Sequence, residues 1–87
     1  MYRVLIKNYI SNLTPIQVKQ FAKEKHVELT EQEVIYFTNF IKKNWQTLLY
    51  QNAENLFKEV KANVRPEIFE LAKKEFIQAK NKYQSFL

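Results

Sequence analysis

The sequence contains no cysteine, no glycine and no aspartate, and it has only two prolines. Without cysteine the chain can form no disulfide, no thiolate nucleophile and no zinc site built on sulfur. Without glycine it lacks the residue on which phosphate-binding and dinucleotide-binding loops depend. The tight turns of β-hairpins also lose their usual residue with positive φ, which disfavours β architecture. We expect Asn or His to take such positions at helix ends instead.

The residues of a conventional catalytic site are scarce. His26 is the only histidine, and the serines Ser11 and Ser85 lie near the two ends of the chain, so no triad can be assembled in the usual way. No Glu precedes a His by three residues, which is the pattern of helical di-iron sites. We therefore expect no enzymatic activity, no metal, no cofactor and no small-molecule substrate. His26 is assigned a structural role at a helix C-terminus, where a cation or a left-handed residue is favoured.

The remaining composition is that of a chain that folds by itself. Its 87 residues are 46% hydrophobic, which is enough for one core and predicts a single domain over residues 1–87. The apolar cluster from Val4 to Ile6 is too short for a signal peptide or a membrane span. Together with the absence of cysteine, this predicts a cytoplasmic protein with no membrane partner.

Two proline starts and one capping box mark the beginnings of helices. Thr14-Pro15 reads as an N-cap followed by Pro at the first helical position, which predicts a helix from about Pro15 to Lys25. Arg65-Pro66 repeats the signal and predicts a last helix from Pro66 to about Ser85. Thr30 and Glu33 have the spacing of a capping box, which predicts a helix that begins there and continues to about Lys43. The short connection at residues 26–29 favours an αα-hairpin.

Two weaker patterns complete the expected fold. Residues 2–10 and residues 53–64 carry apolar side chains at spacings consistent with an opening helix and a fourth helix. The fold class that follows is an all-α bundle of about five helices that contains an αα-hairpin and no sheet.

Residues 44–52 show no clean apolar period and are interpreted as a loop or a helical turn. Large apolar residues outside a regular stripe often anchor a partner, so this segment gives the leading functional hypothesis. The hypothesis is a non-enzymatic module that binds another protein through Trp45, Leu48, Leu49 and Tyr50. Self-association belongs to the same class, because a second copy of the chain would bury any apolar stripe that the hairpin leaves uncovered on the last helix. The alternative is that the segment folds over the bundle and covers its core.

The formal net charge of +5 gives a second hypothesis, because a basic surface attracts nucleic acid through the phosphate backbone. The corner after the Pro15 helix superficially matches a helix-turn-helix, but the helix at the recognition position opens with Glu31 and Glu33, which repel phosphate. A solvated lysine-rich surface is the plainer explanation of the charge. The candidate phosphate contacts are the basic residues Arg3, Lys7, Lys19, Lys23, Lys73, Lys74, Lys80 and Lys82.

The runs Leu13-Thr14-Pro15-Ile16-Gln17-Val18 and Val27-Glu28-Leu29-Thr30-Glu31-Gln32-Glu33 resemble a family of short uncharacterised helical proteins from Bacillus-like Firmicutes. In that family, a Leu-Thr helix start recurs after a short turn, and an Asn-containing loop with an aromatic residue follows. Asn44 and Tyr50 occupy the corresponding places here. The resemblance implies a bacterial all-helical protein and transfers no functional residues.

Overall fold

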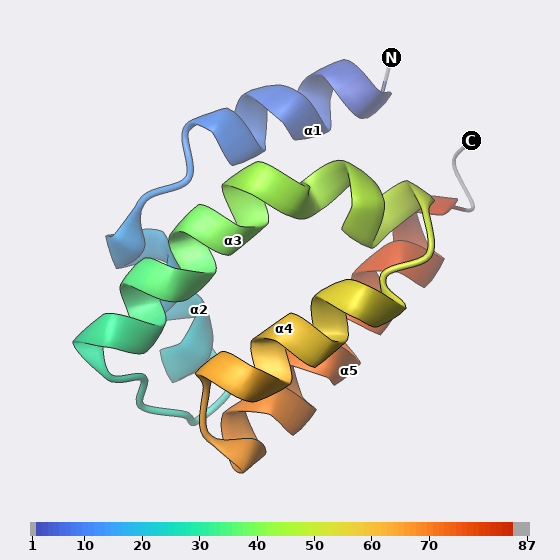
Figure 1. Ribbon diagram of the computed structural model, residues 1–87. Helices are drawn as coiled ribbons and strands as arrows, with labels where there is room; N and C mark the ends of the chain where they lie inside the picture. The colour runs from blue at the N-terminus through green and yellow to red at the C-terminus, as the bar shows by residue number, and fades with distance from the viewer. Residues whose placement is uncertain (1, 85–87) are drawn as a thin grey trace. The chain divides into compact units, whose positions relative to one another are not determined.

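The computed structural model describes residues 2–84, with side chains from residue 4 to residue 83 (Figure 1). Within that range the regular elements are α-helices and there is no strand. They are α1 (Tyr2–Ser11), α2 (Pro15–Glu24), α3 (Glu31–Tyr50), α4 (Glu54–Asn63) and α5 (Pro66–Gln84). The all-α prediction with about five helices is therefore confirmed. Ser85, the expected last residue of the final helix, lies outside the described residues.

Backbone proximity divides the chain into two compact units. The first extends to Trp45 and the second begins at Gln46, so the boundary falls inside α3. The first unit contains α1, α2 and most of α3. The second contains the end of α3 together with α4 and α5. Each unit is described by itself below.

The first turn of α2 is capped by the side chains of Thr14 and Gln17. Thr14 has an extended backbone, and its hydroxyl accepts a hydrogen bond from the Gln17 backbone N–H at 3.3 Å. The Gln17 side-chain oxygen accepts in return from the Thr14 N–H at 3.0 Å. Pro15 takes the first helical position, as expected from the sequence. The reciprocal bond from Gln17 adds a second capping box, since Gln can replace Glu in this motif.

The end of α2 depends on a histidine in the left-handed region. His26 has φ 62°, the only positive φ among the described residues. Its N–H donates to the Lys23 carbonyl at 3.0 Å, and the next N–H, that of Val27, donates to the Ala22 carbonyl at 2.9 Å. These two bonds form a Schellman motif, in which the left-handed position usually holds Gly. The structural role expected of His26 is confirmed, and the glycine-free sequence explains why His occupies the position.

The start of α3 contains the capping box that the sequence predicts. The Thr30 hydroxyl accepts from the Glu33 N–H at 3.1 Å, and the Glu33 carboxylate accepts from the Thr30 N–H at 3.0 Å. Glu33 is only 5% exposed, so this carboxylate is held at the edge of the core by the bond to the backbone. Burial of a charged side chain is tolerated only when such partners are present.

The interpretation of residues 44–52 as a loop or a single helical turn is wrong for most of the segment. Residues 44–50 are the last part of α3, which runs without interruption for 20 residues from Glu31 to Tyr50. The apolar period is present when it is counted from the preceding turn, because Ile41, Trp45 and Leu48 follow one another at i, i+4 and i+7. Leu49 adds the i+8 position of the same stripe. Asn44 does not interrupt the helix, because the helix propensity of Asn is less favourable than that of Ala by only about 0.7 kcal/mol at most.

Most of the buried apolar side chains in both units come from helix faces, while Leu13 and Ala53 lie in the connections before α2 and α4. In the first unit they are Leu13, Val18, Ala22, Val34, Phe37 and Phe40. In the second unit they are Leu48, Leu49, Ala53, Val60, Ile68 and Phe69. Thr38 is also buried and satisfies its hydroxyl by donating to the Val34 carbonyl at 2.7 Å.

In the second unit, α4 and α5 pack against each other. The rings of Phe57 and Phe76 are stacked, with centroids 6.4 Å apart and planes 7° from parallel. Val60 on α4 is 1% exposed. A longer-range bond joins α5 to the end of α3, because the Lys80 ammonium donates to the Gln51 carbonyl at 2.8 Å. A cation at this position satisfies a carbonyl that the helix itself leaves without a partner.

The left-handed conformation of His26 predicts opposite effects for two substitutions. His26→Gly removes the steric cost of a left-handed side chain, which exceeds the entropic cost of Gly, so we expect stabilisation by about 0.5–1 kcal/mol. His26→Val places a β-branched side chain there, and we expect destabilisation by about 1–2 kcal/mol. Urea denaturation followed by helical circular dichroism measures both. His26→Asn, which tolerates this backbone region, serves as the near-neutral control. A loss of stability in His26→Gly would contradict the assignment.

Candidate interaction surface

The segment expected to anchor a partner contributes to the core. Leu48 is 4% exposed and Leu49 is 8% exposed, while Trp45 and Tyr50 are half-buried. The expectation of an irregular loop fails because these residues lie on α3, where helical spacing turns them toward the buried stripe. Leu48 and Leu49 therefore offer little surface to a partner. Of the four predicted contact residues, only Trp45 and Tyr50 retain appreciable exposure.

The exposed apolar side chains are concentrated near the N-terminus. Among the described side chains, the large apolar residues left exposed are Val4, Leu5, Tyr9, Ile16, Phe21, Ile35 and Ile77. Three of them come from the ten residues of α1. Single exposed apolar residues are normal, but a local group on one short helix suggests a contact surface.

We call Val4, Leu5 and Tyr9 the α1 apolar face. Their exposed fractions are 61%, 60% and 64%. Leu5 and Tyr9 are one turn apart, and Val4 is the sequence neighbour of Leu5, so the three side chains lie within one half of the helix circumference. The less exposed Ile6 and Ile10 lie on the other half. The sequence does not distinguish the two halves, because both carry large apolar residues.

The α1 apolar face lies in a part of the chain without acidic residues. The first Glu is Glu24, whereas Arg3, Lys7, Lys19 and Lys23 all precede it. Lys7 is exposed and lies three residues after Val4, so it borders the apolar face. The side chain of Arg3 is outside the described residues. Exposed apolar side chains and basic residues without acidic ones therefore occur together on α1, and sequence spacing alone does not show which of its apolar residues are exposed.

On α2, the exposed apolar residues are partly engaged by neighbours. The Lys25 ammonium lies 5.5 Å from the centroid of the Phe21 ring, within the range of a cation–π contact. Lys19 forms an ion pair with Glu31 at 3.4 Å. Both partners of that pair are mostly exposed, so it adds little stability. Lys23 is one turn from Lys19, as the sequence predicts, and the two share an exposed side of α2.

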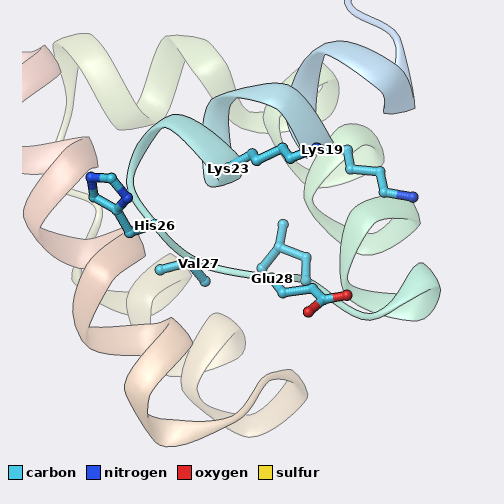
Figure 2. A pocket seen from close by; sticks show the side chains of 6 residues that line it. Lys19, Lys23, His26, Val27 and Glu28 are labelled. Carbon is cyan, nitrogen blue, oxygen red and sulfur yellow. The ribbon is translucent and has the colours of Figure 1, made fainter.

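An open hollow with a volume of about 360 Å³ lies at the corner between α2 and α3. It is lined by Lys19, Lys23, His26, Val27, Glu28 and Leu29 (Figure 2). In Figure 2 the two lysines extend from α2, and the imidazole of His26 points away from them. The Glu28 carboxylate also lines the hollow. The hollow is poorly suited to an anion for three reasons. Glu28 is acidic, Lys19 is already paired with Glu31, and the hollow lies at the C-terminal end of α2, where the helix dipole is negative.

The four lysines predicted on the last helix do not form one basic face. Lys73 and Lys80 are two turns apart and share a side of α5, whereas Lys82 lies on the opposite side at 100° per residue. Lys80 is also engaged, through its bond to the Gln51 carbonyl. Lys74 is exposed and lies between the two sides.

The packing of α4 and α5 places a different pair of lysines against one aromatic ring. Lys61 and Lys73 each place their ammonium 5.9 Å from the centroid of the Phe69 ring. The sequence does not indicate Lys61, because no spacing rule joins residues on two different helices.

Other types of site are absent from the part of the chain that the structure describes. Between residues 2 and 84 there is no group of three or more metal-ligating side chains. No helix in that range combines the length and the apolar character that crossing a bilayer requires. Comparison with protein-family models, with curated proteins and with solved structures finds no match to this chain. The resemblance to the Firmicutes family therefore stays a prediction.

The division between core and surface leucines gives a quantitative prediction. Leu48→Ala leaves a cavity in the core and should lower the free energy of unfolding by about 2–5 kcal/mol. Leu5→Ala, made at an exposed position, should change it by less than about 0.5 kcal/mol. Thermal or urea unfolding of the two matched variants provides the measurement. Equal losses in both variants would contradict the placement of these residues.

Proposed function

We propose that this chain is a non-enzymatic module that binds another protein through the α1 apolar face. The observation that supports the proposal is the 60–64% exposure of Val4, Leu5 and Tyr9 on a single short helix. Removing such side chains from water is favourable by about 25 cal/mol per Å² of apolar surface. A partner that covers the three residues and hydrogen bonds to the exposed Asn8 amide beside them would therefore gain free energy.

The proposal keeps the class of function expected from the sequence and moves its location. The Trp45 segment is not an irregular loop but part of a helix whose leucines are buried, so it no longer provides an exposed anchor. Tyr9 replaces Trp45 as the aromatic candidate anchor. Tyr is well suited to this role because it combines a large ring with a hydroxyl that can hydrogen bond at the rim of an interface. A cytoplasmic location remains part of the proposal.

A second copy of the chain belongs to the same class of partner. An exposed apolar face on a small domain is covered most simply by the same face of another copy, related by a two-fold axis. Self-association through Val4, Leu5 and Tyr9 would therefore be a homotypic form of the proposed interaction.

Binding of nucleic acid is the second candidate function, and the pair of lysines at Phe69 favours it. Lys61 and Lys73 come from two helices of the second unit, and the ammonium groups of both contact the same ring. Two neighbouring cations can contact successive phosphates. The net charge of +5 adds a nonspecific attraction.

A site-specific photocrosslink tests the first candidate. A photoreactive benzophenone side chain at position 9 preserves the aromatic character of Tyr9 and should crosslink a discrete protein, or a second copy, in cells. We expect Leu5→Ser in the same chain to reduce that product at least about tenfold, because loss of an anchor commonly costs more than about 1.4 kcal/mol.

The matched control carries the same photoreactive group at Ile77, an exposed apolar position on α5. Mass spectrometry identifies the products. Identical products from positions 9 and 77, or a product insensitive to Leu5→Ser, would exclude the α1 apolar face as the binding surface. Circular dichroism of each variant checks that the helices are retained.

A salt series tests the second candidate. If phosphate contacts drive binding, the logarithm of the affinity for duplex DNA should fall linearly with the logarithm of salt concentration, by about 0.9 per contact. Lys61→Glu with Lys73→Glu should then flatten the slope by about two contacts. Lys19→Glu with Lys23→Glu makes the same charge change on α2 and serves as the comparison. Absence of binding to DNA and RNA at low salt would end this candidate.

A further inference from the structure

If the α1 apolar face binds a protein, its chemistry also restricts the partner. Building on that proposed function, we infer that the partner presents an acidic amphipathic helix. Three features of the described residues lead to this class: the bonding of the α1 backbone, the spacing of its exposed apolar residues and the one-sided charge around them.

The backbone of α1 leaves the partner to bind through side chains. Except at its two ends, the N–H and C=O groups of α1 bond within the helix, and its backbone is not extended, so a peptide cannot add to it as a strand. The described residues contain no sheet edge that would take such a strand instead. Helix-on-side-chain packing is the remaining common mode of peptide recognition for a surface of this kind.

The spacing of the exposed residues suits a helical partner. Leu5 and Tyr9 are one turn apart, and Val4 widens the apolar strip on one side. A partner helix with apolar residues at i, i+3 and i+4 presents anchors at the same one-turn interval. Since α1 has ten residues and is about 15 Å long, the matching segment is about three turns. An interface this small is weak and transient, which fits a regulatory or assembly contact better than a permanent one.

The charge of α1 itself favours an acidic partner, because the helix contains Arg3 and Lys7 and no acidic residue. No carboxylate occurs before Glu24, so an anionic helix approaching α1 meets no repulsion from the first 23 residues. Lys7 lies at the edge of the apolar strip, where it can contact a carboxylate on the flank of the partner. Cations at such a rim mainly raise the association rate and select against basic partners.

Two other anionic partners fit the face less well. Asn8 and Asn12 are exposed beside the apolar residues, and the Asn12 side chain is bonded to the Asn8 carbonyl at 2.9 Å. Burial of these amides in lipid would leave polar groups unsatisfied, whereas a protein partner can bond to them. Nucleic acid would stack on Tyr9 but would gain little from the aliphatic side chains of Val4 and Leu5.

A selection from a display library of helix-forming peptides, with randomised residues at every surface position, tests this inference. The bait is the full chain. We expect enriched peptides to combine an apolar stripe with an excess of Asp and Glu. A bait with Lys7→Glu should lower the affinity of a selected acidic peptide about twofold to fivefold, as loss of an exposed ion pair of up to about 1 kcal/mol implies. A bait with Leu5→Ser should abolish enrichment.

The control bait carries Lys74→Glu, which makes the same charge change at an exposed residue of α5 and should leave the affinity unchanged. Enrichment of neutral or basic peptides would overturn the inference. The inference would also be overturned if the chain bound phosphatidylserine vesicles or an oligonucleotide more strongly than the selected peptides and Leu5→Ser abolished that binding. The two tests can give different answers. If position 9 still crosslinks to a protein but the selected peptides are not acidic, the proposed function stands and only the acidic partner is excluded.

Discussion

Because the chain has no glycine, other residues must cap its helices, and most of the local structure depends on these caps. The exposed N–H groups at the starts of α2 and α3 are satisfied by reciprocal capping boxes, one with Gln17 and one with Glu33. The end of α2 uses His26 in the left-handed region, with the two bonds of a Schellman motif. These caps set the corner from which α3 begins.

The same requirement acts at the end of α3 through a residue far along the chain. Lys80 donates to the carbonyl of Gln51, 29 positions earlier in the sequence. Because the bond joins α5 to the end of α3, it contributes both to helix capping and to the tertiary structure of the second unit. Because of this bond, Lys80 is less available for contacts at a basic surface. The cations that converge elsewhere, Lys61 and Lys73, do so around an aromatic ring instead.

The candidate surface is defined by what the fold leaves uncovered. Apolar residues surround most of α1, and a ten-residue helix can bury only one side of itself against its own chain. Ile6 and Ile10 take the less exposed side, which leaves Val4, Leu5 and Tyr9 in contact with water. The helix contains no acidic residue, and the exposed Lys7 borders this side. Binding of a protein is the use proposed for a surface of this composition.

The sequence alone determined the helical class and the helix starts, because capping residues and Pro at the first turn act over three or four residues and need no tertiary partner. It also determined the role of His26, since no Gly was present to take the left-handed position. The sequence interpretation failed at residues 44–50, where the apolar period becomes visible only when it is counted from Ile41 in the preceding turn. Only the tertiary structure decided which side of α1 is exposed, which lysines converge and how the end of α3 is capped. Each of these depends on contacts between residues that are distant in the chain, and a local pattern carries no information about such contacts.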